Sequence, residues 1–192
     1  MANEMGNLKK TVVAAMLIAL CVLLPMAFHG VPMAGSTLLP MHIPVLLAGL
    51  ICGWKFGLIA GLAGPILSSL ITGMPPMGIV PIMMLELGIY GLIAGIVVQF
   101  VRTRRTVFDL YISLMTAMII GRVVAGFAQA IYFFGGGTFS LFGHGYTLTM
   151  WMTSYFITSL PGIVIQLAFI PSVVMALERE RVIPLRYPIR AH

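Results

Sequence analysis

The chain has 192 residues, of which 60% are hydrophobic and only 8% are charged. Soluble domains usually carry about a quarter charged residues, and a chain of this length cannot bury so much apolar surface in one core. The composition therefore predicts a protein embedded in lipid. The net charge of +6 does not indicate a nucleic-acid-binding protein, because the basic residues stand in short groups between long apolar runs.

Six apolar runs follow one another along the chain, and each is expected to form a transmembrane helix. They cover residues 11–28, 41–54, 56–73, 79–101, 109–134 and 148–177. A span needs about 20 residues, so the stretch 41–73 is either one long tilted helix or two shorter helices that turn at Gly53, Trp54 and Lys55. The whole chain, residues 1–192, is predicted to be a single all-α integral membrane domain.

The distribution of Lys and Arg separates the one-helix and two-helix interpretations. With a hairpin at Lys55, every basic group in the connections falls on one side of the membrane, whereas a single helix would place the later groups on the other side. Three connections contain no Lys or Arg at all: 29–40, 74–78 and 135–147. Because basic residues favour the cytoplasmic side, six spans with both termini in the cytoplasm are predicted.

Small residues recur four apart in several of the predicted helices. The first helix contains Ala15 and Ala19, and two glycine series follow: Gly49, Gly53, Gly57 and Gly61, then Gly91 and Gly95. Residues spaced in this way share one helix face and let another backbone approach closely. The sequence leaves open which of these stripes packs internally and which is an exposed docking face.

Two charged residues stand well inside the predicted spans, away from their ends: Glu86 and Arg122. An unpaired charge in hydrocarbon costs at least about 2.5–3.5 kcal/mol, so both side chains must face protein or a wet cavity. One interpretation is a buried structural ion pair between them. The other is that Arg122 meets an anionic group of a ligand while Glu86 accepts a proton from a ligand hydroxyl or amide. Both can hold, because an ion pair can line a pocket.

Five further side chains complete the candidate substrate-binding set: His42, Tyr90, Gln129, Trp151 and Tyr155. The first tyrosine follows Glu86 by one turn and lies on the same helix face. The histidine stands between two prolines near the expected outer mouth, where it is either an interfacial or a ligand-binding residue. The glutamine is suited to helix-to-helix hydrogen bonding or to ligand contact. The last two form an aromatic pair that fits either the interfacial belt or a stacking wall for a ligand.

The sequence gives little support to catalysis. It contains no metal-ligand cluster, no nucleophile motif and no phosphate-binding loop, and Cys21 and Cys52 are isolated in apolar segments. No enzyme activity, cofactor or metal is therefore expected. Since no ATPase sequence is present, any ATP-driven transport must draw on other subunits.

Several of these segments together resemble the substrate-binding (S) component of energy-coupling factor (ECF) vitamin transporters. The resemblance rests on the six-helix plan and on five segments: Ala15–Ala19, Pro40–Leu50, Gly53–Gly57, Leu70–Pro76 and Glu86–Gly91. It covers most of the chain and is specific for the family but not for the vitamin.

The resemblance implies a small high-affinity vitamin-binding subunit of an ABC importer in a prokaryotic plasma membrane. Such a subunit would dock through Ala15 and Ala19 on a transmembrane coupling subunit that carries two cytoplasmic ATPases. The vitamin would lie near the outer face, between helices four to six. Buried Arg122 favours a carboxylate-bearing vitamin, pantothenate before folate, biotin or niacin, while uncharged pyridoxine stays open. A stand-alone facilitator and a membrane enzyme remain as different functional classes.

Overall fold

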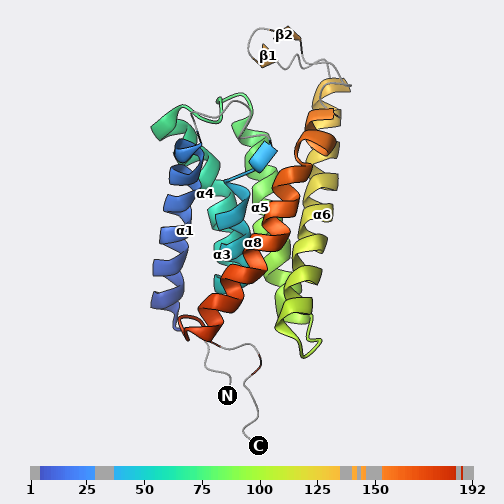
Figure 1. Cartoon of the computed structure of the whole chain (residues 1–192). Helices are drawn as coiled ribbons and strands as arrows, with labels where there is room; N and C mark the ends of the chain where they lie inside the picture. The colour runs from blue at the N-terminus through green and yellow to red at the C-terminus, as the bar shows by residue number, and fades with distance from the viewer. Residues whose placement is uncertain are drawn as a thin grey trace, which may run out of the picture.

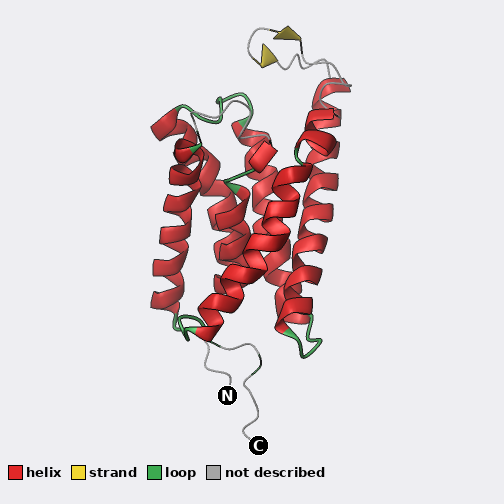
Figure 2. Cartoon of the chain, viewed as in Figure 1, coloured by secondary structure: helices red, strands yellow, loops and turns green. Residues whose placement is uncertain are grey.

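The computed structural model describes residues 5–28, 37–134, 140–141, 144–145, 153–184 and 187. In this part of the chain six α-helices form an elongated bundle, with a π-helix and one pair of very short strands (Figures 1 and 2). The helices are α1 (Asn7–Ala27), α3 (His42–Cys52), α4 (Trp54–Thr72), α5 (Val80–Phe100), α6 (Thr106–Phe134) and α8 (Leu160–Arg179). The smaller elements are β1 (Ser140–Leu141), β2 (His144–Gly145) and the π-helix η1 (Thr153–Thr158). The predicted all-helical architecture is confirmed.

Five of the described helices, α1, α4, α5, α6 and α8, are long and apolar enough to cross a membrane. The exception is α3, which has 11 residues and is therefore about 17 Å long, against roughly 30 Å of hydrocarbon. α3 thus lies within the run predicted over 41–54 and is slightly shorter than that run. Most of α3 is buried, because it packs between α1, α4, α5 and α8 inside the bundle.

The ambiguous stretch 41–73 forms two helices, as the positions of the basic residues predicted. The turn consists of a single residue, Gly53, with φ 100° and ψ 171°. Glycine adopts such a positive φ without the steric cost that a side chain would incur. Because the turn is so short, Trp54 and Lys55 already belong to the first turn of α4.

The glycine stripes pack internally. A Cβ added at Gly49 or Gly57 would overlap the Gly91 backbone, and one at Gly61 would overlap the backbone of Leu87. A Cβ at Gly95 would likewise meet the backbone at the start of α4. The three helices α3, α4 and α5 therefore touch backbone to backbone, as expected for small residues four apart.

The alanine stripe of α1 points the other way. This helix packs on α3 and α4 through a buried face that contains Ala14, Leu17 and Cys21. Ala15 and Ala19 are exposed on the opposite face. The structure thus separates the two stripes: the glycines hold the bundle together, and the alanines lie on its outer surface.

Contacts between distant parts of the chain fasten the end of the bundle at which α1 begins and α8 ends (Figure 1); we call it the basic end. There the Lys9 ammonium donates to the carbonyl of Val182. Ile183 is buried against the core. The hydroxyl of Tyr187 donates to Asp109 Oδ2 at 2.5 Å, so the segment after α8 contacts both α1 and α6.

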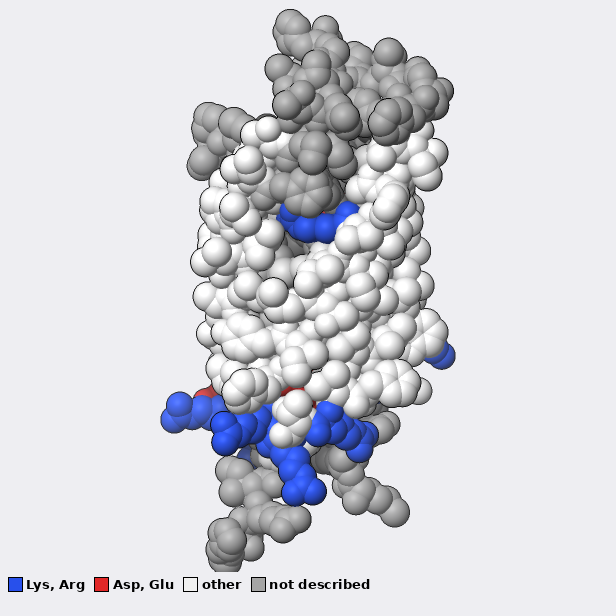
Figure 3. Space-filling view, turned by 90° about the vertical axis from the view of Figure 1, so that its right-hand side faces the viewer, with Lys and Arg blue, Asp and Glu red and all other residues white. Residues whose placement is uncertain are grey.

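Basic side chains gather at this end of the molecule, below a face that is almost entirely uncharged (Figure 3). The connection after α5 contributes Arg102, Arg104 and Arg105, and the end of α8 contributes Arg179 and Arg181. The loop between α4 and α5, which includes Gly78, lies at the opposite end (Figure 1). This separation is the pattern that predicts a cytoplasmic basic end.

Cysteine labelling tests that orientation. In a protein with Cys21 and Cys52 replaced, a cysteine at Gly78 should react with an impermeant maleimide on intact cells. A cysteine at Arg104 should react only after the cells are permeabilised, because the basic connections stay in the cytoplasm. Labelling of Arg104→Cys on intact cells, with Gly78→Cys protected, would invert the predicted topology.

Candidate functional site

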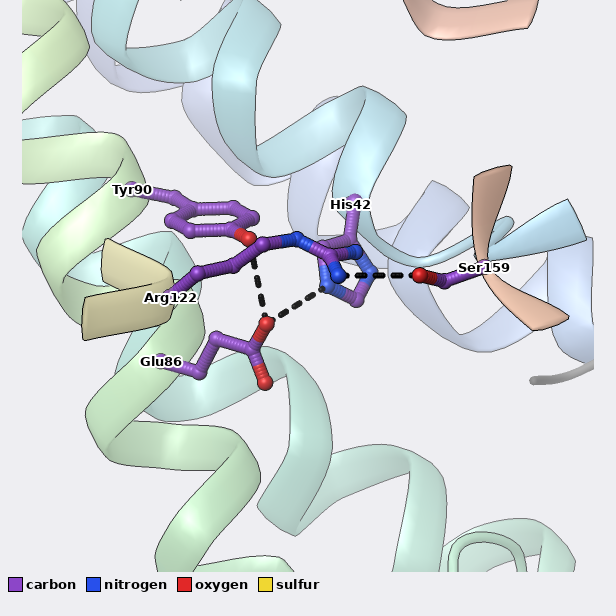
Figure 4. A network of polar contacts seen from close by, with 5 residues as sticks. All are labelled: His42, Glu86, Tyr90, Arg122 and Ser159. Atoms are coloured by element: carbon purple, nitrogen blue, oxygen red, sulfur yellow. Dashed lines mark hydrogen bonds and ion pairs between the residues drawn. The ribbon is translucent and has the colours of Figure 1, made fainter. Parts of the chain in front are cut away.

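A basic side chain lies in a hollow on one face of the bundle, away from the basic end (Figure 3). Within the predicted spans, Arg122 is the only Lys or Arg in the sequence. Figure 4 shows its surroundings: His42 from α3, Glu86 and Tyr90 from α5, and Ser159, which directly precedes α8. We call these five residues the polar cluster. Helices distant in sequence thus place their polar side chains at one level of an apolar bundle.

The Glu86 carboxylate is held by two neighbours. Tyr90 donates its hydroxyl to Glu86 Oε1 at 3.1 Å, one helical turn away, as the spacing of these residues predicted. His42 Nε2 lies 3.8 Å from the same oxygen. The rings of His42 and Tyr90 pack edge to face with centroids 5.3 Å apart. The acid is therefore fixed by α3 and by its own helix.

The Arg122 guanidinium extends from α6 across the site, and its Nη1 donates to Ser159 Oγ at 2.9 Å (Figure 4). In the described part of the chain, however, the direct contacts of the Glu86 carboxylate are those to Tyr90 and His42. One of the two sequence-based interpretations was a direct ion pair between Glu86 and Arg122. These two described residues do not form it; the ion-pair contact of Glu86 is with His42.

The position of Ser159 depends on a break in the last apolar run. The sequence predicted one continuous span over 148–177, whereas the structure has the π-helix η1 up to Thr158 and then α8 from Leu160. Pro161 stands in the first turn of α8, where a residue without an N–H is tolerated. The helix restarts there, and Ser159 precedes it with its hydroxyl toward Arg122.

The position of His42 depends on where α3 begins. α3 begins at this residue, and its N-cap, Met41, supplies no side-chain hydrogen bond. His42 is 4% exposed, so it lies inside the bundle and not at the rim where the sequence suggested. Irregular backbone at membrane depth is tolerated only where it is buried in protein or lines a cavity, and both interruptions meet at the polar cluster.

Close packing fixes the remaining member of the cluster. Tyr90 is 1% exposed, and a Cβ added at Gly121 of α6 would overlap its ring. Gly121 precedes Arg122 in the chain. The glycine thus lets the tyrosine ring lie against the α6 backbone beside the arginine.

The cluster brings several kinds of polar group together inside an apolar bundle. It combines a permanently charged donor fork, a fixed carboxylate, a hydroxyl and an imidazole. Among the described residues, no group of three or more His, Cys, Asp or Glu side chains could hold a metal ion.

The other predicted site residues are not part of the polar cluster. Gln129 is half-buried on α6, two turns beyond Arg122. Trp151 lies outside the described residues, as does the side chain of Tyr155 in η1. Ser159 was missed by the sequence reasoning, although its place directly before Leu160 and a proline is typical of a helix start.

A comparison with known protein families assigns this bundle. The model for the substrate-specific component of ECF transporters matches residues 9–174. The chain belongs to this family. It is therefore a transport subunit and a multi-pass protein of a prokaryotic plasma membrane. No curated protein and no solved structure matches the chain.

The Tyr90–Glu86 hydrogen bond generates a prediction about this S component. Tyr90→Phe removes a donor from a buried carboxylate, which should lower the free energy of unfolding by about 1.5–3 kcal/mol. The melting temperature of the purified protein in detergent measures this loss. Tyr111→Phe is the matched control, since Tyr111 is 40% exposed on the outer surface of α6, and it should leave the melting temperature unchanged. Equal melting temperatures for both variants would contradict a structural role for this bond.

Proposed function

We propose that this S component binds a carboxylate-bearing water-soluble vitamin, such as pantothenate, in the polar cluster. The observation that carries the proposal is the Arg122 guanidinium, which lies among the polar side chains of four helix segments with Ser159 as a hydrogen-bonding neighbour (Figure 4). A charge is costly at membrane depth, and a planar donor fork is suited to a carboxylate. The vitamin carboxylate would bind there.

Glu86 would accept a hydrogen bond from a second polar group of the vitamin. Tyr90 and His42 both contact Glu86 Oε1. The other carboxylate oxygen, Oε2, would accept a hydrogen bond from the ligand. A hydroxyl or amide N–H of the vitamin suits this acceptor. Pantothenate carries both groups in addition to its carboxylate, whereas nicotinate carries the carboxylate without them. Folate, biotin and pyridoxine complete the set of candidate vitamins.

A stand-alone facilitator fits the structure less well. Such a protein needs a polar path from one side of the membrane to the other. Between the polar cluster and the basic end, the interior is filled by fully buried apolar side chains that include Leu46, Leu114, Ala94 and Ala48. A bundle that is polar at one level and packed beyond it is suited to hold a ligand and not to conduct it.

Membership of the family implies association with the ECF transport module. We infer that the partners are a transmembrane coupling subunit with two cytoplasmic ATPases, and that α1 is the docking helix. The exposed alanines Ala15 and Ala19 support this, because small side chains on an outer helix face permit close approach of another helix.

The first test is a ligand screen with arginine variants. The melting temperature of the purified protein should rise with pantothenate and not with pyridoxine, since a ligand stabilises the folded state by RT ln(1 + [L]/Kd). Arg122→Lys keeps the charge but loses the fork, so binding should weaken by about 1.5–3 kcal/mol. Isothermal titration measures the change.

Arg102→Lys is the control for that experiment, because this arginine lies in the exposed connection after α5. It should bind like the wild type. Undiminished affinity in a well-folded Arg122→Lys protein would show that the fork does not hold the carboxylate, and stabilisation by pyridoxine alone would exclude a carboxylate ligand.

The docking face has its own prediction. Ala15→Trp and Ala19→Trp should abolish vitamin uptake by cells while purified protein still binds vitamin, because a large side chain blocks close helix approach without touching the polar cluster. Ile119→Trp is the matched control, since Ile119 is 57% exposed on α6. Normal uptake by both alanine variants would exclude α1 as the docking helix.

A further inference from the structure

The imidazole of His42 is enclosed in the bundle with neither of its nitrogens hydrogen-bonded. The residue is 4% exposed, and within the described part of the chain both Nδ1 and Nε2 lack a hydrogen-bond partner. A neutral imidazole carries its proton on one nitrogen only. Whichever nitrogen that is, the other has a lone pair that can take up a second proton.

The nearest charged group favours the protonated form of this ring. Glu86 Oε1 lies 3.8 Å from His42 Nε2, and opposite charges at this distance attract more strongly inside a protein than in bulk water. The ring also packs edge to face on Tyr90, with centroids 5.3 Å apart. The imidazole thus stands beside an acceptor for the proton that it would gain.

The other groups around His42 do not change charge near neutral pH. Its helix, α3, packs on α1, α4, α5, α6 and α8. Among the described residues, the titratable or charged side chains of these helices on the His42 side are Cys21, Glu86, Tyr90 and Arg122. The Lys, Arg, Asp and Glu residues of α1, α4 and α8 stand at the basic end. At pH 7 a thiol, a phenol and a guanidinium are protonated and a carboxylate is ionised, which leaves the histidine as the group that titrates.

The two permanent charges of the polar cluster cancel in the protein without vitamin. Glu86 is the only acidic residue between Glu4 and Asp109, and Arg122 is the only Lys or Arg in the predicted spans. A proton on His42 would add an uncompensated positive charge, which is costly inside an apolar bundle. A carboxylate bound at Arg122 adds a negative charge instead, and a proton on His42 then restores neutrality.

We propose that His42 takes up one proton from bulk water when the carboxylate of the substrate binds at Arg122. The inference rests on the proposed function and adds a regulation of that site, because affinity for a carboxylate vitamin then falls as the pH rises through neutrality. An imidazole ordinarily changes its charge between pH 5 and 8. By linkage, the proton strengthens vitamin binding by the same factor as the vitamin strengthens proton binding.

Calorimetric titration with pantothenate measures the proton uptake. The experiment is made at pH 7.5 in phosphate and in Tris, two buffers that differ in ionisation enthalpy and that supply the proton. The difference between the two observed enthalpies gives the uptake, for which we expect about 0.5–1 proton per vitamin. Between pH 7 and pH 8 the Kd should therefore rise roughly threefold to tenfold. The vitamin carboxylate stays ionised over this range and does not contribute.

His42→Gln assigns the proton, because an amide keeps a polar side chain and gains no charge in this pH range. Its proton uptake should be near zero, and its Kd should be the same at pH 7 and pH 8. His144→Gln is the matched control, since His144 lies in the strand β2, outside the helices. It should take up protons like the wild type.

A second measurement serves if His42→Gln does not bind the vitamin. In wild-type protein labelled with ¹³C at the histidine Cε1 atoms, the His42 resonance is assigned by its absence from the spectrum of the vitamin-free variant. At pH 7.5 this resonance should move to the imidazolium position when pantothenate is added. An unmoved resonance would overturn the inference.

The outcomes separate this inference from the proposed function. Pantothenate binding without proton uptake by the wild type would overturn the inference and leave the carboxylate site standing. Uptake that persists in His42→Gln would place the proton on another group and would overturn it as well. If pantothenate does not bind, the proposed vitamin is wrong, and the titrations are made with folate, biotin and nicotinate. If none of these carboxylates binds, the proposed function fails and the inference fails with it.

Discussion

The cost of placing a guanidinium and a carboxylate at membrane depth governs the arrangement of the bundle interior. Glu86 is satisfied by Tyr90 and His42, and Arg122 reaches the hydroxyl of Ser159. Each partner comes from a different structural position, so the charges can be accommodated only when α3, α5, α6 and α8 have assembled. The polar cluster is thus a consequence of tertiary packing, and the proposed substrate site depends on the whole fold.

Two features of the backbone make this assembly possible. Glycines bring α3, α4 and α5 into backbone contact around Gly91, which holds the second half of α3 close to α5. α3 begins at His42, and α8 begins directly after Ser159, so two of the polar groups stand where helices start. The glycine-packed helices α3 and α5 contribute Glu86, Tyr90 and His42. Arg122 comes from α6, and Ser159 precedes α8.

The sequence predicted the helical membrane architecture, the hairpin at Gly53 and the shared face of Glu86 and Tyr90, because composition, charge and helical periodicity are local properties. It did not predict the break before α8, since this break lies within an apolar run whose hydropathy is continuous. The exposure of Ala15 and the burial of His42 also depend on which helices pack together. The sequence did not indicate Ser159 as a partner of Arg122, because the two residues are 37 positions apart and meet only in the folded bundle.

The contacts at the basic end have a mechanical consequence. Because Lys9 holds Val182, and Tyr187 holds Asp109, α1, α6 and α8 are fastened to one another there. α1 has 21 residues and is about 30 Å long, so a tilt of about 5° around that fastening moves its far end by about 3 Å. A rotation of α1 about this fastening would therefore displace the far end of the helix most and the basic end least.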